Sequence, residues 1–206
     1  MRGLQTTGGA PLNTGQTSHG RHVRTLAVVA AVAYALDVVT KIIVVATLEG
    51  QEPVRLIGDF LRLRVIRNSG AAFGIGTGMT IVFTLIAVAV VIAILRTARR
   101  LRSMPWAIAL GLLLGGALGN LTDRICRGPA PFQGHVVDFI SLPHYPVFNL
   151  GDSAICVGGV LAVFLAWRGY QVDGGRGVTP PERPSSEDGH AEPSMPAEGR
   201  ATEESR

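Results

Sequence analysis

The chain of 206 residues has only two cysteines, Cys126 and Cys156, which is too few for a disulfide framework. One lies at the end of an apolar block and the other lies inside one, so both are expected to be packing residues. Metal ligands are missing as well, because His135 and His144 are isolated and no group of His, Cys, Asp and Glu has zinc or iron spacing. The sequence therefore predicts no metal and no other cofactor.

Charged residues are scarce, since Asp, Glu, Lys and Arg make up 17% of the chain and the net charge is +4. The arginines stand at the ends of apolar blocks and form neither a basic stripe nor a patch interleaved with aromatic residues. Basic flanks of this kind are the ordinary mark of membrane topology. We therefore expect no nucleic-acid partner.

Amphipathic periodicity is also missing, because the apolar residues are gathered into four blocks. Each block approaches the roughly 20 residues that cross about 30 Å of hydrocarbon, although the second and third are short and should stand nearly upright or thin the bilayer. The sequence therefore predicts an all-α integral membrane protein with four transmembrane helices. The blocks are Leu26–Leu48, Met79–Leu95, Met104–Leu121 and Phe148–Trp167.

Four spans place both termini on one side of the membrane, and that side holds more of the arginines, including the cluster at residues 96–102. The positive-inside rule then predicts cytoplasmic termini. Residues 1–22 and 171–206 have too few apolar groups to offset their ordering entropy and are expected to be disordered tails flanking a membrane domain at 23–170. Arg21 and Arg24 before an apolar run resemble a secretory signal, but that run continues to Leu48 and three more spans follow.

Two connections are expected on the outer side. Pro53–Ile66 alternates between apolar and polar residues and is interrupted by Gly58, which predicts short strands in a small extracytoplasmic β-cradle. The connection from Gly128 to Pro146 is punctuated by proline and glycine and is expected to be an irregular outer loop with one apolar stretch, Val136–Ile140.

Five ionisable residues lie inside or beside the apolar blocks, where each costs several kcal/mol unless it is paired or hydrated: Asp37, Lys41, Asp123, Arg124 and Asp152. Asp37 and Lys41 are four residues apart, so they are expected to form a structural ion pair that orients the first helix. A direct chemical role for this pair is the alternative.

The third block contains Gly111, Gly115 and Gly119, a ridge of small residues that lets another helix approach closely. Just beyond it, Asn120, Asp123 and Arg124 share one helical face. They predict an interhelical hydrogen-bond cluster or, alternatively, a site in which Arg124 or Asn120 holds a substrate carbonyl.

Asp138 is flanked by bulky apolar residues, so it needs either a partner or a raised pKa. Asp152 begins the fourth block, where Asn149 is suited to be the N-cap and the positive end of the helix favours an ionised carboxylate. If the loop folds back over the start of the fourth helix, the two carboxyls can share a proton, as in aspartic peptidases.

Four ordered motifs between roughly residues 25 and 168 resemble lipoprotein signal peptidase, the bacterial signal peptidase II: 68–74 (NSGAAFG), 115–124 (GGALGNLTDR), 135–139 (HVVDF) and 148–154 (FNLGDSA). The resemblance implies a bacterial cytoplasmic-membrane peptidase, expected to be a monomer, that cuts prolipoproteins just before a diacylglyceryl-modified cysteine in the outer leaflet. Its partners would be these substrates and membrane lipids. The implied roles are catalysis by Asp138 and Asp152, substrate contact by Asn68, Arg124 and Asn149, and support by Asn120, Asp123, Gly70, Asp37 and Lys41.

Two positions depart from the family pattern. Val38 stands where the family usually has Gln, and Gly151 where it usually has Ala, which is expected to loosen the start of the fourth helix. A presenilin-like peptidase is less suitable, because Asn149 replaces the first glycine of its Gly-x-Gly-Asp signature. A small proton-coupled transporter or channel using Asp37, Asp123 and Asp152 is the non-enzymatic alternative.

Overall fold

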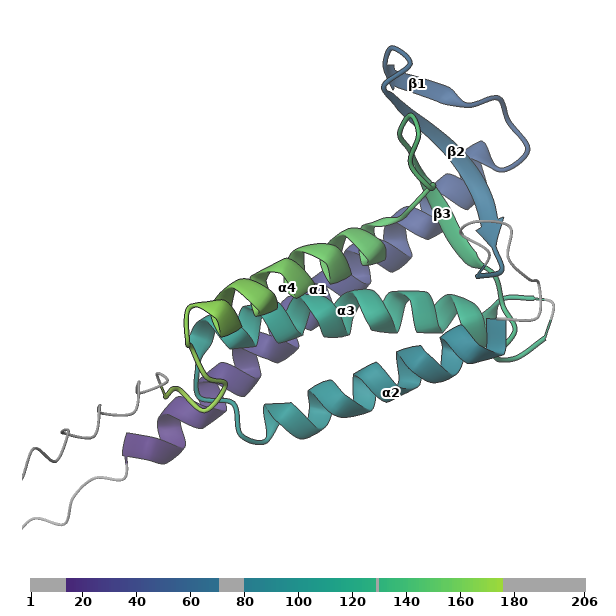
Figure 1. The fold of residues 1–206 in the computed structure, drawn as a ribbon. Coiled ribbons are helices and arrows are strands. Elements are labelled where there is room, and N and C mark those ends of the chain that lie inside the picture. The colour runs from purple at the N-terminus through teal and green to yellow at the C-terminus, as the bar shows by residue number, and fades with distance from the viewer. Residues whose placement is uncertain (1–13, 71–79, 129, 176–206) are drawn as a thin grey trace, which may run out of the picture.

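The computed structural model describes residues 14–70, 80–128 and 130–175 (Figure 1). Seven elements follow one another in this part of the chain: α1 (Thr14–Leu48), β1 (Val54–Ile57), β2 (Leu61–Asn68), α2 (Thr80–Ala98), α3 (Met104–Cys126), β3 (Val136–Ser141) and α4 (Leu150–Trp167). Most of both predicted tails and the motif residues 71–74 lie outside the described residues.

All four helices are long and apolar enough to cross a membrane, which confirms the predicted architecture. Helix α3 is central and packs against the other three, whereas α2, among the described elements, packs substantially on α3 alone (Figure 1). Large apolar side chains on the outer helix faces are exposed, as expected for surfaces that meet lipid.

Helix α1 begins at Thr14, well before the apolar block and within the segment assigned to the N-terminal tail. The apolar pattern marks only the part of a helix that needs a lipid environment, and polar residues can continue it beyond the hydrocarbon. Here the extension also has tertiary contacts. A ring nitrogen of His19 lies 2.8 Å from the Leu101 carbonyl oxygen, and His22 is buried.

The glycines of α3 bring α1 close, as predicted. A Cβ added at Gly111 would lie 2.9 Å from the Leu26 carbonyl oxygen, and one at Gly115 would lie 2.7 Å from the Ala33 Cβ. The expectation for the cysteines is wrong, because the side chains of Cys126 and Cys156 are exposed on the helix surface. Composition alone does not tell a lipid-facing position from a packed one.

The three strands form an antiparallel sheet in the order β1-β2-β3, located at one end of the helix bundle (Figure 1). Strands β1 and β2 confirm the short strands predicted within residues 53–66. The prediction of an irregular loop at 128–146 is wrong for its apolar stretch, because residues 136–141 form β3 and pair with β2 from Ser141 opposite Arg62 to Val136 opposite Asn68. This pairing is long-range, so the proline and glycine pattern of the loop carries no signal for it.

Candidate active site

The candidate site lies where α1, α3 and α4 meet the sheet (Figure 1). Its centre is Lys41, whose side chain is fully buried. The Lys41 Nζ lies 2.7 Å from Asp37 Oδ2, 3.0 Å from Asp123 Oδ2 and 2.8 Å from Asn120 Oδ1. The predicted ion pair of Asp37 and Lys41 is therefore confirmed, and Lys41 also joins α1 to α3.

Asp123 receives further contacts that balance its buried charge. The Arg127 Nε donates to Asp123 Oδ1, and the Val137 N–H donates to Asp123 Oδ2 at 3.1 Å. Asp123 thereby fixes β3 against the end of α3. Arg127 was not singled out from the sequence. Its position four residues after Asp123 is nevertheless the helical spacing of an ion pair.

The remaining oxygen of Asp37 reaches α4. Asp37 Oδ1 accepts a hydrogen bond of 2.7 Å from the Gly151 N–H. A Cβ at residue 151 would lie 3.1 Å from both the Asp37 Cγ and the Asn149 Oδ1, so glycine gives this carboxylate room. The expected loosening of α4 by Gly151 is thus opposed by a buried hydrogen bond to α1.

Asn149 is the N-cap of α4, as predicted. Its Oδ1 accepts the Asp152 N–H at 2.8 Å, and its own N–H donates to Asp152 Oδ2 at 3.2 Å, which completes a capping box. Its Nδ2 donates to Asp138 Oδ1 at 2.6 Å and to Asn120 Oδ1 at 3.2 Å. One fully buried side chain therefore contacts both candidate catalytic residues.

Asp138 lies in β3 and is 2% exposed. Ile140 and Phe148 exchange backbone hydrogen bonds of 2.8 and 3.0 Å, which folds the strand back onto the start of α4. Burial, and to a smaller extent nearby Asp152, raise the pKa of Asp138 to about 6, although hydrogen bonds from Asn68 and Asn149 act in the opposite direction. The prediction that Asp138 needs a partner or a raised pKa is confirmed on both counts.

Asn68 is held in place by its own turn. The Asn68 Nδ2 donates to Asp138 Oδ2 at 2.7 Å, and its Oδ1 accepts the Gly70 N–H at 2.8 Å. Gly70 has φ +102°, and a Cβ there would lie 2.6 Å from the Phe83 ring. Only glycine suits this conformation and this contact, so Gly70 supports the orientation of Asn68.

Asp152 is partly exposed at the first turn of α4, and its Oδ1 accepts the Asn120 Nδ2 at 2.7 Å. It lines a cavity of about 320 Å³, whereas Asp138 and Asn68 line another of about 330 Å³. Tyr145, which is 65% exposed, borders both cavities. Solvent and an extended ligand can therefore approach the two carboxyls from both sides of this ring.

Arg124 faces a third cavity of about 260 Å³, which it lines with Asn120 and residues of α2 and α4. Its guanidinium carbon lies 5.8 Å from the centre of the Phe83 ring, and its buried Nη1 has no hydrogen-bond partner among the described residues. A buried guanidinium N–H of this kind requires an acceptor such as a peptide carbonyl. Among the described residues no ion pair or side-chain hydrogen bond joins Arg124 to the Lys41 cluster, although Arg124 shares this cavity with Asn120.

The described part of the chain contains no cluster of three or more His, Cys, Asp and Glu side chains arranged to hold a metal ion. The site presents two unequal carboxyls that are joined through one asparagine and bordered by cavities.

Comparisons with known proteins agree on one family. A family model described as signal peptidase (SPase) II matches residues 29–168. A lipoprotein signal peptidase of Streptomyces coelicolor is 59% identical over 159 residues, covering 77% of this chain and 78% of that protein, and one of Rhodococcus jostii is 54% identical over 151 residues, covering 73% and 76%. A solved structure of a bacterial membrane enzyme at 1.9 Å resolution has a TM-score of 0.61 and 31% identity, covering 69% of this chain and 92% of that chain. The chain therefore belongs to the signal peptidase II family.

Proposed function

We propose that this chain is a membrane aspartic endopeptidase that removes signal peptides from prolipoproteins, cutting just before a cysteine that carries a diacylglyceryl group. The observation that carries the proposal is the connection of Asp138 and Asp152 through Asn149, whose Nδ2 and N–H donate to one carboxyl each. The family and the similarity to lipoprotein signal peptidases support removal of signal peptides from lipoproteins.

In the proposed mechanism Asp152 is the general base. It accepts hydrogen bonds from the Asn120 side chain and the Asn149 N–H at the first turn of α4, and these contacts orient its carboxyl beside the cavity that it lines. Asp138 is the general acid, because its pKa of about 6 leaves it protonated far more readily than an ordinary aspartate.

The proton transfers then balance over two steps. Asp152 takes a proton from water while the water oxygen bonds to the scissile carbonyl carbon, and Asp138 gives its proton to the carbonyl oxygen. When the tetrahedral intermediate collapses, Asp152 passes its proton to the leaving amine nitrogen and Asp138 recovers a proton from the intermediate. Both carboxyls return to their starting states.

The substrate backbone is proposed to bind beside the dyad. Arg124 offers its unpaired buried Nη1 to a peptide carbonyl, and Asn68 borders the cavity beside Asp138. The Asn149 amide hydrogen-bonds to Asp138, Asn120 and the Asp152 N–H, so we assign it to positioning the dyad instead of contacting substrate.

We place the dyad toward the extracytoplasmic leaflet of the cytoplasmic membrane, with both termini on the cytoplasmic side. The C-terminal ends of α2 and α4 lie at the end of the helix bundle opposite the sheet (Figure 1), and the arginines at 96–102 and Arg168 are at or just beyond these ends, as the positive-inside rule requires for that orientation. A proton relay is less well supported, because Asp37, Asp123, Asp138 and Asp152 gather at one end and do not extend through the membrane depth.

The test uses the purified full chain in detergent with a diacylated prolipoprotein, and it measures release of the signal peptide. Asp138→Asn and Asp152→Asn should each lower cleavage at least about a thousandfold while the protein still inserts and folds, because each removes a proton-transfer group without emptying the core. EDTA should leave the rate unchanged.

Asp123→Asn is the matched control, since it changes a buried carboxyl that lies outside the dyad. Its melting temperature should fall clearly, while the cleavage rate per folded molecule should fall far less than in the two dyad variants. Substantial activity in either dyad variant would refute the mechanism. A chelator effect that is reversed by zinc would show that the reaction needs a metal.

A further inference from the structure

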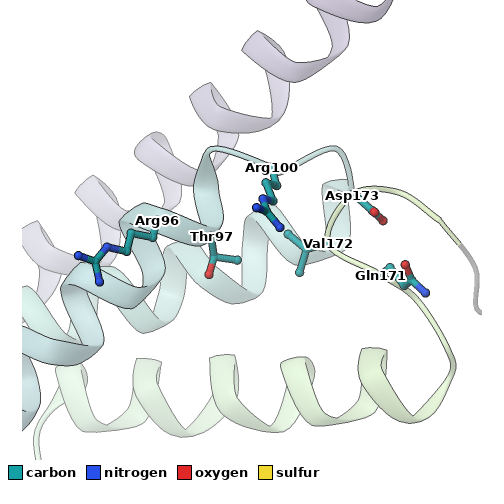
Figure 2. Close-up of a pocket in the computed structure, with 6 residues that line it drawn as sticks. All are labelled: Arg96, Thr97, Arg100, Gln171, Val172 and Asp173. Carbon is teal, nitrogen blue, oxygen red and sulfur yellow. The ribbon is translucent and has the colours of Figure 1, made fainter.

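A second candidate site lies at the end of the bundle opposite the dyad. A cavity of about 450 Å³ separates the C-terminal end of α2 from the segment after α4. Figure 2 shows its lining side chains: Arg96, Thr97 and Arg100 come from α2 and the turn after it, and Gln171, Val172 and Asp173 come from the C-terminal segment. The Arg102 N–H donates to the Val172 carbonyl at 2.8 Å, which fixes the two walls to each other.

The charge of this cavity is not neutralised within the described residues. Neither Arg96 nor Arg100 forms an ion pair with any side chain in residues 14–70, 80–128 or 130–175. The carboxylate of Asp173 also lines the cavity, but its Oδ1 accepts the Gly175 N–H at 3.1 Å. Two guanidinium groups therefore face one carboxylate, which leaves a net positive charge for an anion.

The surroundings indicate the depth of a lipid headgroup. Trp106 donates from Nε1 to the Tyr170 carbonyl at 2.9 Å, and Trp167 at the end of α4 is 78% exposed. Tryptophan and tyrosine concentrate at the membrane–water interface, so these side chains mark that level beside the cavity.

The same face of α2 offers a path for acyl chains. Ile92 and Arg96 are four residues apart in α2, so they lie along one side of the helix, and Arg100 follows in the turn after it. Ile92 is 42% exposed and lies one turn deeper in the membrane than Arg96. This order of apolar and cationic groups matches a phospholipid whose phosphate reaches the arginines while its chains follow the helix.

We propose that this cavity binds the phosphate of an anionic phospholipid in the leaflet opposite the dyad. Arginine suits phosphate because its planar guanidinium donates two parallel hydrogen bonds. Basic pockets between membrane helices on the cytoplasmic side bind anionic headgroups. The bound lipid would add to the Arg102–Val172 hydrogen bond in joining the end of α2 to the segment after α4, because α2 and α4 themselves have no substantial contact among the described elements.

The experiment titrates the full chain in neutral detergent with dioctanoyl-phosphatidylglycerol and counts bound lipids by native mass spectrometry. We expect one saturable lipid and binding weaker by about thirtyfold in an Arg96→Gln/Arg100→Gln double variant. Arg99→Gln/Arg102→Gln is the matched control, because it removes the same charge from the same end of the protein outside the cavity lining. It should bind nearly as well as the unmodified chain.

Three further arms separate the possible sources of binding. Asp173→Asn should tighten binding severalfold, because it removes the repelling carboxylate. Dioctanoyl-phosphatidylcholine and glycerol phosphate should bind far more weakly, since one lacks net charge and the other lacks chains. Equal losses in the two double variants, or equal binding of glycerol phosphate, would overturn the proposal in favour of diffuse charge attraction or a free-phosphate site. Signal-peptide release in detergent should be the same in all variants, which separates this test from that of the dyad.

Discussion

At the scale of single residues, the hydrogen bond from Asn68 to Asp138 has a measurable effect on pH dependence. In the proposed mechanism Asp138, whose pKa burial raises to about 6, must carry a proton to act, so kcat/KM should fall as the pH rises through the titration of the coupled pair. Asn68 lowers this pKa by donating to the ionised form. Asn68→Ala should therefore move the alkaline limb of the kcat/KM profile to higher pH, besides raising KM.

Ser69→Ala is the matched control for this measurement. Ser69 lines the same cavity, but no hydrogen bond joins its side chain to Asp138 in the described structure. The alkaline limb of the kcat/KM profile of Ser69→Ala should coincide with that of the unmodified chain. A limb that stays in place in Asn68→Ala, or moves to lower pH, would contradict the assignment of Asp138 as the acid.

Lys41 supports a prediction about stability, because its buried ammonium contacts both Asp37 and Asp123. Lys41→Met keeps most of the side-chain volume but leaves two buried carboxylates with less compensation. Removing one partner of a buried ion pair costs about 3–5 kcal/mol. The variant should unfold at a clearly lower temperature in detergent, as followed by circular dichroism.

The exposed ion pair of Arg55 and Asp59 provides the comparison, with side chains that are 68% and 70% exposed. Arg55→Gln should change stability by less than about 1 kcal/mol. If Lys41→Met melts at the same temperature as Arg55→Gln, the buried cluster does not stabilise the fold.

At the scale of elements, the contact of α3 with α1 depends on glycine. A Cβ at Gly115 would lie 2.6 Å from the Ala30 carbonyl oxygen and 2.7 Å from the Ala33 Cβ, so Gly115→Ala must push the two helices apart. Overpacking of this kind costs about 1–3 kcal/mol. Gly159→Ala in α4 is the control, because no atom lies within 4 Å of its added Cβ. Equal melting temperatures for the two variants would show that the close approach is unimportant.

The sequence predicts the elements that have a local signal. The four spans, the first two strands, the ion pair at i and i+4 and the Asn149 cap all depend on neighbours within a few positions, so composition and spacing reveal them. Strand β3 and the link between Asp138 and Asn149 depend on pairing across distant segments. Motif resemblance supplied the pair of aspartates, but only the tertiary structure places Asn149 between them.

At the scale of the whole molecule, the proposed orientation makes the lipid anchor of the substrate part of recognition. Acyl burial contributes about 0.8 kcal/mol per CH₂, and a substrate held in the leaflet approaches the dyad in two dimensions. The unlipidated precursor should therefore be cleaved about a hundredfold less efficiently, mainly through a higher KM. Equal cleavage of both substrates would remove the lipid from recognition.

The orientation itself can be tested by labelling in intact cells. Pro143 is exposed in the connection between β3 and α4, so Pro143→Cys should react with a membrane-impermeant maleimide added outside. Cys126 and Cys156 are also exposed and must first be replaced by serine. Labelling that requires opening of the cytoplasmic side would invert the proposed topology.

The position of the capping box late in the chain also bears on biogenesis. Synthesis proceeds from the N-terminus, so Asp37 and Lys41 enter the membrane long before Asn149 and Asp152 leave the ribosome. Until α4 is inserted, Asp138 has neither its Asn149 donor nor its partner carboxyl. If the proposed mechanism holds, a nascent chain that stalls before α4 has no hydrolytic activity toward the unprocessed precursors around it, and competence appears only once Asn149 and Asp152 have entered the membrane.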